Sequence, residues 1–291
     1  MKVLFLGNDG NLVQVISRMK NTVIVGIVAD EVNLQERKIF GSSALFAKHK
    51  KIPFVSQEYF HKHYNRLILR QWKDVDVIFS QGYHYRILPE LLSNARIKIV
   101  NFHQSLLPDY RGRHPLNWVI VNGEKKTGIT FHYVNEGFDE GTIIVQKPIT
   151  VSLSDDVISL YRKTIRAAEK ILPDVFKKIA DPDFIPRKQN LSAGRYFPVR
   201  KPEDGRINPE DSVAVVKNKI RALIYPYPGA FFEYEVKKIV VDQIKRINIK
   251  RRDGNQNFIY KNNGKFYLKL SDAVVVVQKI RKQKVYFKRT E

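Results

Sequence analysis

Short runs rich in Val and Ile alternate with amphipathic segments along the first hundred residues, and this alternation constrains the fold most. Segments such as 12–19 and 43–49 carry apolar residues at the three-and-four spacing that predicts a helix. Buried strands that alternate with helices indicate a parallel sheet covered on both faces. We therefore predict an α/β fold with a doubly wound, mostly parallel, Rossmann-like sheet. The apolar runs lie at 3–6, 23–28, 53–55, 77–79 and 97–100.

The pattern changes after Thr127. Two strand-like runs, GITFHYV and TIIVQKPITV, flank the glycine-punctuated loop NEGFDEG. A long amphipathic helix pattern follows, with Ser154 as its N-cap candidate and Pro173 inside it or at a break. A proline-rich segment then separates this region from a β-rich one that suits a small barrel or compact sheet. We predict a catalytic domain over 1–195, a linker over 196–205 and a C-terminal domain over 206–291.

The bulk composition bounds the class of protein. At 291 residues, 43% of them hydrophobic, the chain can build real cores. It has no cysteine, which excludes disulfides and thiolate metal sites. The opening MKVLFLGNDG is too short an apolar run for a signal peptide or a membrane span. We expect a cytoplasmic protein with no membrane partner and no resident metal.

The net charge of +22 favours a polyanionic partner, because basic surfaces attract nucleic acids. From Glu235 to Glu291 there are 16 Lys and Arg against 5 Asp and Glu, so half of the excess lies in the last fifth of the chain. A solvated basic face would look the same in sequence. Both interpretations stay open.

The stretch NFHQSLLPDYRGRHPLN, residues 101–117, directly follows a predicted buried strand. Ligands of open parallel sheets bind at the carboxyl ends of strands. Asn101 and His103 are two residues apart, so they would face the same side. With Asp139 from the NEGFDEG loop they form a coherent set: the acid supports an imidazole that moves a proton, and the amide donates to an oxyanion. The alternatives are that His103 satisfies local backbone and that Asp139 is a turn residue; His132 is expected to be a packed core residue.

NFHQSLLPDYRG, followed by RHPLNWVIVNGEKKTGITFHYVNEGFDEGTII, resembles the folate-dependent formyltransferase family, whose members use N10-formyltetrahydrofolate. The family pattern of an Asn, a His two positions on, an SLLP-x-Y-RG loop and a downstream Asp is matched in order and spacing. Weaker similarity runs from Met1 through DVIFSQGYHYRILP to PEDGRIN and RALIYPYPGAF. That last pair resembles the start of the family's C-terminal domain, an open barrel of OB type.

The resemblance implies roles for the residues of this chain. Asn101 would donate to the oxyanion, His103 would take or relay the proton of an amine, and Asp139 would hold the imidazole's tautomer and stabilise its charged form. The folate would contact Tyr85, Arg86, Ile87, Leu88, Ser105, Leu106, Leu107, Pro108 and Gly137. The acceptor would contact Gly7, Asn8, Gly10, Arg111, Gly112, Arg113 and Asn117.

The acceptor is the open question. RGRHPLNWVIVNGE looks closest to the formyltransferase domain acting on UDP-4-amino-arabinose, which favours a nucleotide-linked 4-amino sugar and a role in polysaccharide biosynthesis. The alternative is a methionyl-tRNA formyltransferase acting on initiator tRNA. Relatives of that kind carry a basic insertion after the second strand, and ADEVNLQERKIFGSSALFAKHKKIPFV lacks it. A third hypothesis is a non-catalytic nucleotide- or RNA-binding protein on the same scaffold. A homodimer stays open.

Overall fold

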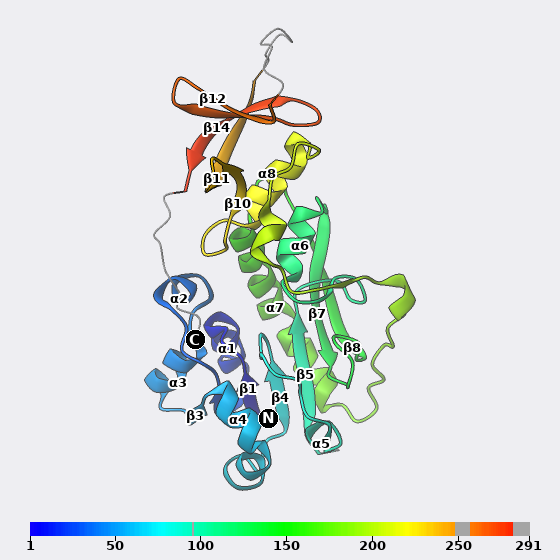
Figure 1. Ribbon diagram of the computed structural model, residues 1–291. Coiled ribbons are helices and arrows are strands. Elements are labelled where there is room, and N and C mark those ends of the chain that lie inside the picture. The colour runs from blue at the N-terminus through cyan, green and yellow to red at the C-terminus, as the bar shows by residue number, and fades with distance from the viewer. Residues whose placement is uncertain (95, 248–256, 282–291) are drawn as a thin grey trace. The chain divides into compact units, whose positions relative to one another are not determined.

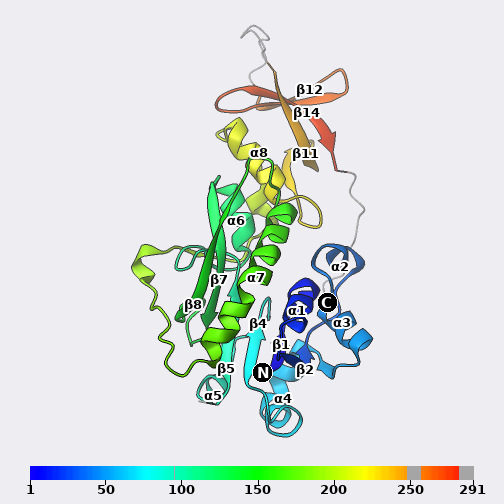
Figure 2. The same cartoon turned by 180° about the vertical axis from the view of Figure 1, so that it is seen from behind.

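The computed structural model describes residues 1–94, 96–247 and 257–281 (Figures 1 and 2). The predicted strand segments at 248–250 and 282–287 lie outside the described residues. The chain divides into two compact units, each with its own core. The first comprises Met1–Pro115, Lys125–Ser152 and Ile158–Pro198, and the second comprises Leu116–Glu124, Leu153–Val157 and Val199–Glu291.

The first unit is built on a sheet with the strand order β3-β2-β1-β4-β5-β7-β8. The strands from β3 to β5 in this order are parallel, whereas β7 runs antiparallel to both β5 and β8. The order reverses between β1 and β4, which is where ligands of such sheets bind. The strands are β1 (Lys2–Leu6), β2 (Val23–Val28), β3 (Phe54–Val55), β4 (Val77–Ser80), β5 (Lys98–His103), β7 (Lys126–Tyr133) and β8 (Ile143–Thr150).

Helices cover both faces of this sheet, as the sequence predicts. One face buries apolar residues of α1 (Gly10–Ser17), α3 (Ser43–Lys50) and α7 (Val157–Ala180). The other face buries residues of α4 (Gln57–Arg66), the π-helical turn η1 (Leu67–Gln71) and α5 (Pro89–Leu92). Pro173 lies inside α7 rather than at a break. The shorter elements of this unit are α2 (Leu34–Phe40), β6 (Arg111–Gly112), η2 (Leu191–Ala193) and β9 (Tyr196–Phe197).

The second unit contains an open, OB-like antiparallel sheet in the order β10-β11-β14-β13-β12, which confirms the predicted β-rich region. Helix α8 packs Val213, Val216 and Ile220 into the core of this sheet. No helix within the described ranges is both long enough and apolar enough to cross a membrane. The elements are α6 (Pro115–Val121), η3 (Pro202–Gly205), α8 (Val213–Ala222), β10 (Ala230–Tyr234), β11 (Lys237–Ile247), β12 (Ile259–Asn262), β13 (Lys265–Lys269) and β14 (Val274–Ile280).

Candidate active site

Asn101 and His103 lie at the carboxyl end of β5, in the middle of the first unit's sheet. Asn101 pairs with Ser80 of β4 on one side and with His132 of β7 on the other. The intervening Phe102 is 3% exposed and packs into the core, so the amide and the imidazole share the opposite side. This is the placement that the two-residue spacing predicts.

Asp139 reaches these two residues from the loop between β7 and β8. Its φ of +56° is a left-handed conformation that Asp tolerates better than most residues. Its Oδ1 lies 3.3 Å from Nδ2 of Asn101 and 3.4 Å from Nδ1 of His103. The Asn101 amide, the His103 imidazole and the Asp139 carboxylate therefore meet at the carboxyl end of β5, although Asp139 is far from the other two in the sequence.

The other carboxylate oxygen of Asp139 is held by backbone. Gly112 N donates to Oδ2 over 2.9 Å. Gly112 has a φ of +99°, and a Cβ there would lie 2.1 Å from the carbonyl oxygen of Phe197, so the position requires glycine. The SLLP-x-Y-RG loop thus contributes a hydrogen bond that fixes the acid.

Asp139 is held ionised. Burial alone would raise the pKa of this carboxyl, but the positive charge of an imidazolium at His103 or His132 and the hydrogen bond from Gly112 outweigh it. The net result is a pKa well below the usual range for Asp. The site therefore presents a fixed negative charge to any imidazolium that forms beside it.

The neutral tautomer of His103 is set by a backbone carbonyl. Nε2 lies 2.7 Å from the carbonyl oxygen of Tyr110, so this nitrogen carries the hydrogen and donates it. In the neutral ring Nδ1 then keeps a lone pair, facing Asp139. The resemblance assigned the tautomer to Asp139, whereas the geometry gives that task to Tyr110 and leaves Asp139 to stabilise the charged form.

His132 belongs to this cluster, and its interpretation as a mere core residue was incomplete. Its ring is 2% exposed, but Nδ1 lies 2.9 Å from the carbonyl oxygen of Tyr133 and Nε2 lies 3.1 Å from Nδ2 of Asn101. A hydrogen on Nδ1 makes Nε2 the acceptor for the Asn101 amide. The register that pairs His132 with Asn101 was the missing signal, because a single strand pattern cannot reveal its neighbour.

Several residues predicted to bind the acceptor already have protein partners. Arg111 is mostly buried; it donates to Glu140 Oε1 over 2.9 Å and to the carbonyl oxygen of Leu191 over 3.3 Å. Its guanidinium is bonded to the loop that carries Asp139 instead of facing solvent. Asn117 is 2% exposed and donates to the carbonyl oxygen of Ala222 within the second unit. Arg113 is exposed, and its Nη2 lies 3.3 Å from the carbonyl oxygen of His84.

The loop at the end of β1 lies beside the loop at the end of β4. A Cβ on Gly7, whose φ is +135°, would lie 1.8 Å from the carbonyl oxygen of Gln81. Gly10 is buried in the first turn of α1, and Asn8 Oδ1 accepts hydrogen bonds from the neighbouring loops. The residues predicted for the acceptor at β1 therefore sit at the switch point of the sheet.

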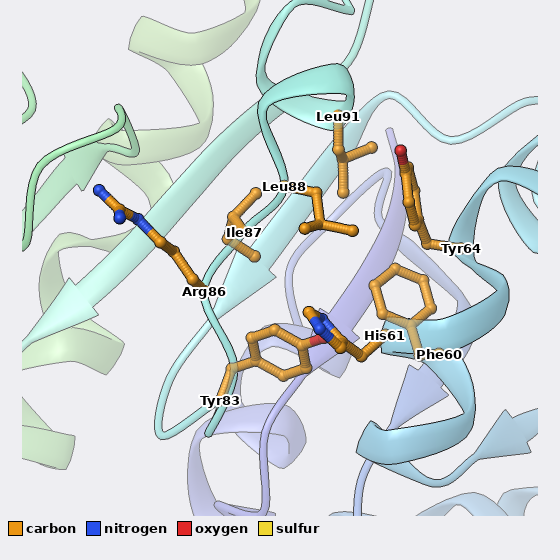
Figure 3. A pocket seen from close by; sticks show the side chains of 8 residues that line it. All are labelled: Phe60, His61, Tyr64, Tyr83, Arg86, Ile87, Leu88 and Leu91. Atoms are coloured by element: carbon orange, nitrogen blue, oxygen red, sulfur yellow. The ribbon is translucent and has the colours of Figure 1, made fainter.

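The segment predicted to bind folate lines a small pocket between α4 and the loop after β4 (Figure 3). Its walls are Phe60, His61, Tyr64, Tyr83, Arg86, Ile87, Leu88 and Leu91. Tyr85 stacks on His61 next to this pocket. The Arg86 side chain extends from the pocket and donates to the carbonyl oxygen of Glu136, which ties the pocket to the loop that holds Asp139.

The remaining residues predicted for folate shape the loop between β5 and β6. Ser105 and Leu107 are buried, and Ser105 Oγ donates to the carbonyl oxygen of Asp109 over 2.7 Å. Leu106 and Pro108 are half-buried, as is Gly137 in the Asp139 loop. Within the described ranges, no group of three or more His, Asp or Glu side chains could hold a metal ion.

Comparisons with known proteins identify the family of this chain. Residues 1–176 match the model of the formyl transferase family, and residues 200–286 match that of its C-terminal domain. The chain belongs to the formyl transferase family. Family membership identifies it as a formyltransferase enzyme.

Solved structures share the fold of this formyltransferase at low identity. An N-formyltransferase from Helicobacter canadensis, in complex with folinic acid and dTDP-3-aminofucose, is 18% identical with a TM-score of 0.69, covering 97% of this chain and 100% of that one. WlaRD, a sugar 3N-formyl transferase studied with dTDP and 5-N-formyl-THF, is 20% identical with a TM-score of 0.67, covering 97% and 98%.

HypX from Aquifex aeolicus is a longer relative in fold. It is 17% identical with a TM-score of 0.63, and the match covers 98% of this chain but 45% of HypX. The chain thus spans less than half the length of HypX.

Proposed function

We propose that this enzyme transfers the formyl group of N10-formyltetrahydrofolate to the primary amine of a nucleotide-linked 4-amino sugar. The observation that carries the proposal is the convergence of Asn101, His103 and Asp139 at the carboxyl end of β5. These are a hydrogen-bond donor, a proton acceptor and a fixed negative charge. Acyl transfer to an amine needs those three and requires no nucleophilic Ser or Cys.

The reaction begins when the amine nitrogen attacks the formyl carbon and forms a tetrahedral intermediate. Asn101 donates from Nδ2 to the oxyanion, which stabilises it by on the order of 3 kcal/mol. His132 accepts the other hydrogen of this amide and so fixes its orientation. The 3.3 Å contact from Asn101 to Asp139 is long enough to yield to a substrate oxygen.

The proton of the attacking amine goes to Nδ1 of His103, because Nε2 is already bonded to Tyr110. The imidazolium that forms lies 3.4 Å from the ionised Asp139. Collapse of the intermediate breaks the bond to the folate nitrogen, and the His103 imidazolium gives its proton to that nitrogen as it leaves, which returns the ring to its neutral form. The products are tetrahydrofolate and an N-formylated sugar. Holding amine and formyl carbon together supplies most of the remaining acceleration.

The loop 83–88 supports the choice of donor. The pocket it lines is small; apart from His61 and Arg86 its walls are apolar and aromatic, so they offer stacking surfaces to a heterocycle and one cation to an anionic group. Folinic acid or 5-N-formyl-THF accompanies two solved enzymes of the same fold. Arg86 links this pocket to the Asp139 loop through its hydrogen bond to the carbonyl oxygen of Glu136.

The structural neighbours support an amino sugar, and their names concern 3-amino sugars, whereas the motif RGRHPLNWVIVNGE favours a 4-amino sugar. A test therefore has to vary both the position of the amine on the sugar and the base of the nucleotide. The protein would be mixed with N10-formyltetrahydrofolate and UDP-, dTDP- or GDP-linked 3- and 4-amino sugars, beside charged initiator tRNA, while tetrahydrofolate release is followed.

We expect release with a nucleotide-linked 4-amino sugar and no release with tRNA. Turnover with a 3-amino sugar alone would overturn the position of the amine and leave the reaction class intact. Turnover with tRNA alone would overturn the acceptor class.

A further inference from the structure

Gln57 joins two loops of the candidate site through a buried amide. It is the first residue of α4 and has no exposed surface. Its Nε2 donates to Asn8 Oδ1 over 3.0 Å, and its Oε1 accepts from His84 N over 2.8 Å. A buried amide costs free energy unless it is hydrogen-bonded, and Gln57 is bonded at both ends to segments far away in sequence.

These partners belong to the loops at the switch point. Asn8 follows β1 and His84 lies in the loop after β4, the two strands between which the strand order reverses. Asn8 Oδ1 also accepts from Asp30 N over 2.8 Å, and Asp30 Oδ1 accepts from Gln57 N over 3.0 Å. The Gln57 side chain therefore joins the loops after β1 and β4, and the loop after β2 is tied to them through Asn8 Oδ1 and the backbone N–H of Gln57.

The peptide of His84 is held on both of its sides. Gln57 receives its N–H, and Arg113 donates to its carbonyl oxygen over 3.3 Å. The imidazole of His84 is 59% exposed, so the backbone of this residue rather than its ring is what the structure fixes. Two residues further on, the same loop reaches Arg86, Ile87 and Leu88 of the pocket (Figure 3).

We propose that Gln57 is a positioning residue for the formyl donor: it holds the loop 82–88 in the conformation that binds the donor and couples this loop to Asn8. The inference rests on the proposed function, in which residues 85–88 contact the folate. Without the Gln57 amide, the loop would keep its covalent ends but lose the hydrogen bond at its centre. Binding would then have to order the loop, which weakens affinity for the donor without touching the groups that do chemistry.

The decisive variant is Gln57→Met, which keeps the length of the side chain and removes both polar atoms. Gln57→Glu keeps an oxygen that accepts from His84 N but has no donor for Asn8 Oδ1, so it separates the bond to His84 from the bond to Asn8. Gln14→Met, on the exposed face of α1, is the matched control. Hydrogen exchange at the amide of His84 is read first, since it reports the Gln57 bond in the free protein.

We expect exchange at His84 to become at least about tenfold faster in Gln57→Met, with β1, β4 and β5 unchanged, and to stay near wild type in the other two variants. The KM for N10-formyltetrahydrofolate should rise about tenfold in Gln57→Met, with kcat within about twofold. If Gln57→Met gives a poorly folded chain, Gln57→Asn replaces it, because its shorter amide cannot span both partners.

Unchanged exchange at His84, or equally faster exchange across the whole sheet, would refute the positioning role. So would a loss in kcat with an unchanged KM. A different result separates the two proposals. If exchange at His84 is faster in Gln57→Met but the wild type does not use the folate donor, the role of Gln57 in holding the loop is supported and the proposed function is refuted.

Discussion

Asp139 is contacted by one backbone N–H and lies beside two imidazoles and one amide, so its charge organises most of the candidate site. Replacing it with Asn keeps the shape but removes the charge that stabilises an imidazolium at His103. We expect Asp139→Asn and His103→Asn each to lower kcat by at least about a hundredfold, the scale of a lost proton-transfer group. Steady-state kinetics with the donor and the accepted sugar measure this.

The matched control for these variants is His49→Asn, at the exposed end of α3. It should keep wild-type kinetics. Near-normal turnover in both site variants would remove the basis for the roles assigned to them.

The role of His132 in orienting the Asn101 amide can be tested separately. His132→Phe keeps an aromatic ring in the buried space but removes the nitrogen that accepts from Asn101. The freed amide should populate wrong orientations, and kcat should fall about tenfold or more while the donor's KM changes little. His132→Gln retains an acceptor and should lose less. Equal activity in the His132→Phe variant and the wild type would show that the orientation of Asn101 does not depend on this imidazole.

Asp9 gives the chain a pH-dependent stability. Burial at the N-cap of α1 raises the pKa of this carboxyl to about 6, despite hydrogen bonds from Leu12, Tyr161 and Asn11. The folded state thus binds the proton more tightly than the unfolded chain, for which the value is 3.8. The contribution of Asp9 to the free energy of unfolding is therefore greatest below pH 3.8 and falls as the pH rises toward about 6, by about 3 kcal/mol in total.

Asp9→Asn keeps an oxygen for the N-cap and removes the titration. Chemical denaturation from pH 4 to pH 7.5 should show the wild type losing stability relative to this variant across the window. Parallel pH profiles for the two proteins would mean that Asp9 does not titrate as inferred.

Among the elements, the hairpin between β10 and β11 contains an avoidable strain. Glu235 and Val236 both have positive φ, +46° and +58°, and Val236 is fully exposed. A β-branched residue is disfavoured there, whereas the hairpin between β12 and β13 uses Asn263 and Gly264 for the same kind of turn. Replacing Glu235-Val236 with Asn-Gly should stabilise the protein by about 1 kcal/mol.

Thermal unfolding of the intact chain measures this change. Val236→Ala is the control, since it trims the exposed side chain but keeps a Cβ at positive φ. A Tm that is unchanged or lower in the Asn-Gly variant would contradict the assignment of strain to this turn.

The sequence predicts the features that depend on residues close together in the chain, and it does not predict those that depend on contacts between distant segments. Strand runs, the β7–β8 hairpin and α7 follow from local periodicity, and the two-residue spacing places Asn101 and His103 on one side of β5. What periodicity does not contain is the partner of a buried polar group. His132 on β7 and Gln57 on α4 both look like ordinary members of their elements until the tertiary structure brings Asn101 and His84 next to them.

Two residues predicted to bind the acceptor are likewise bonded to partners that the sequence does not reveal. Arg111 and Asn117 are polar and follow the site in sequence, yet Glu140 and the Ala222 carbonyl use their donors. A sequence shows that a guanidinium is near a site but not which anion it faces. Arg113, which remains exposed, is the better candidate for a sugar nucleotide.

In the whole molecule, the two units carry different features: the candidate site and the basic segment. The first carries the entire candidate site, from the switch point to the Asp139 loop. The second contains the basic segment from Glu235 to Glu291, and the basic charge was the main sequence argument for a tRNA acceptor. Charge affects the encounter with any polyanion but does not place an amine at a formyl carbon. The reaction class therefore rests on the first unit, which carries most of the match to the formyl transferase family.

The most direct measurement follows the carbon itself. N10-formyltetrahydrofolate labelled with ¹³C in its formyl group would be mixed with the amino-sugar panel and either wild-type enzyme or Asp139→Asn, and the label located by NMR. We expect a labelled formamide on the 4-amino group of a nucleotide-linked sugar with the wild type, and label left on folate with the variant. Label transferred equally well by both proteins, or found on no sugar at all, would contradict this expectation.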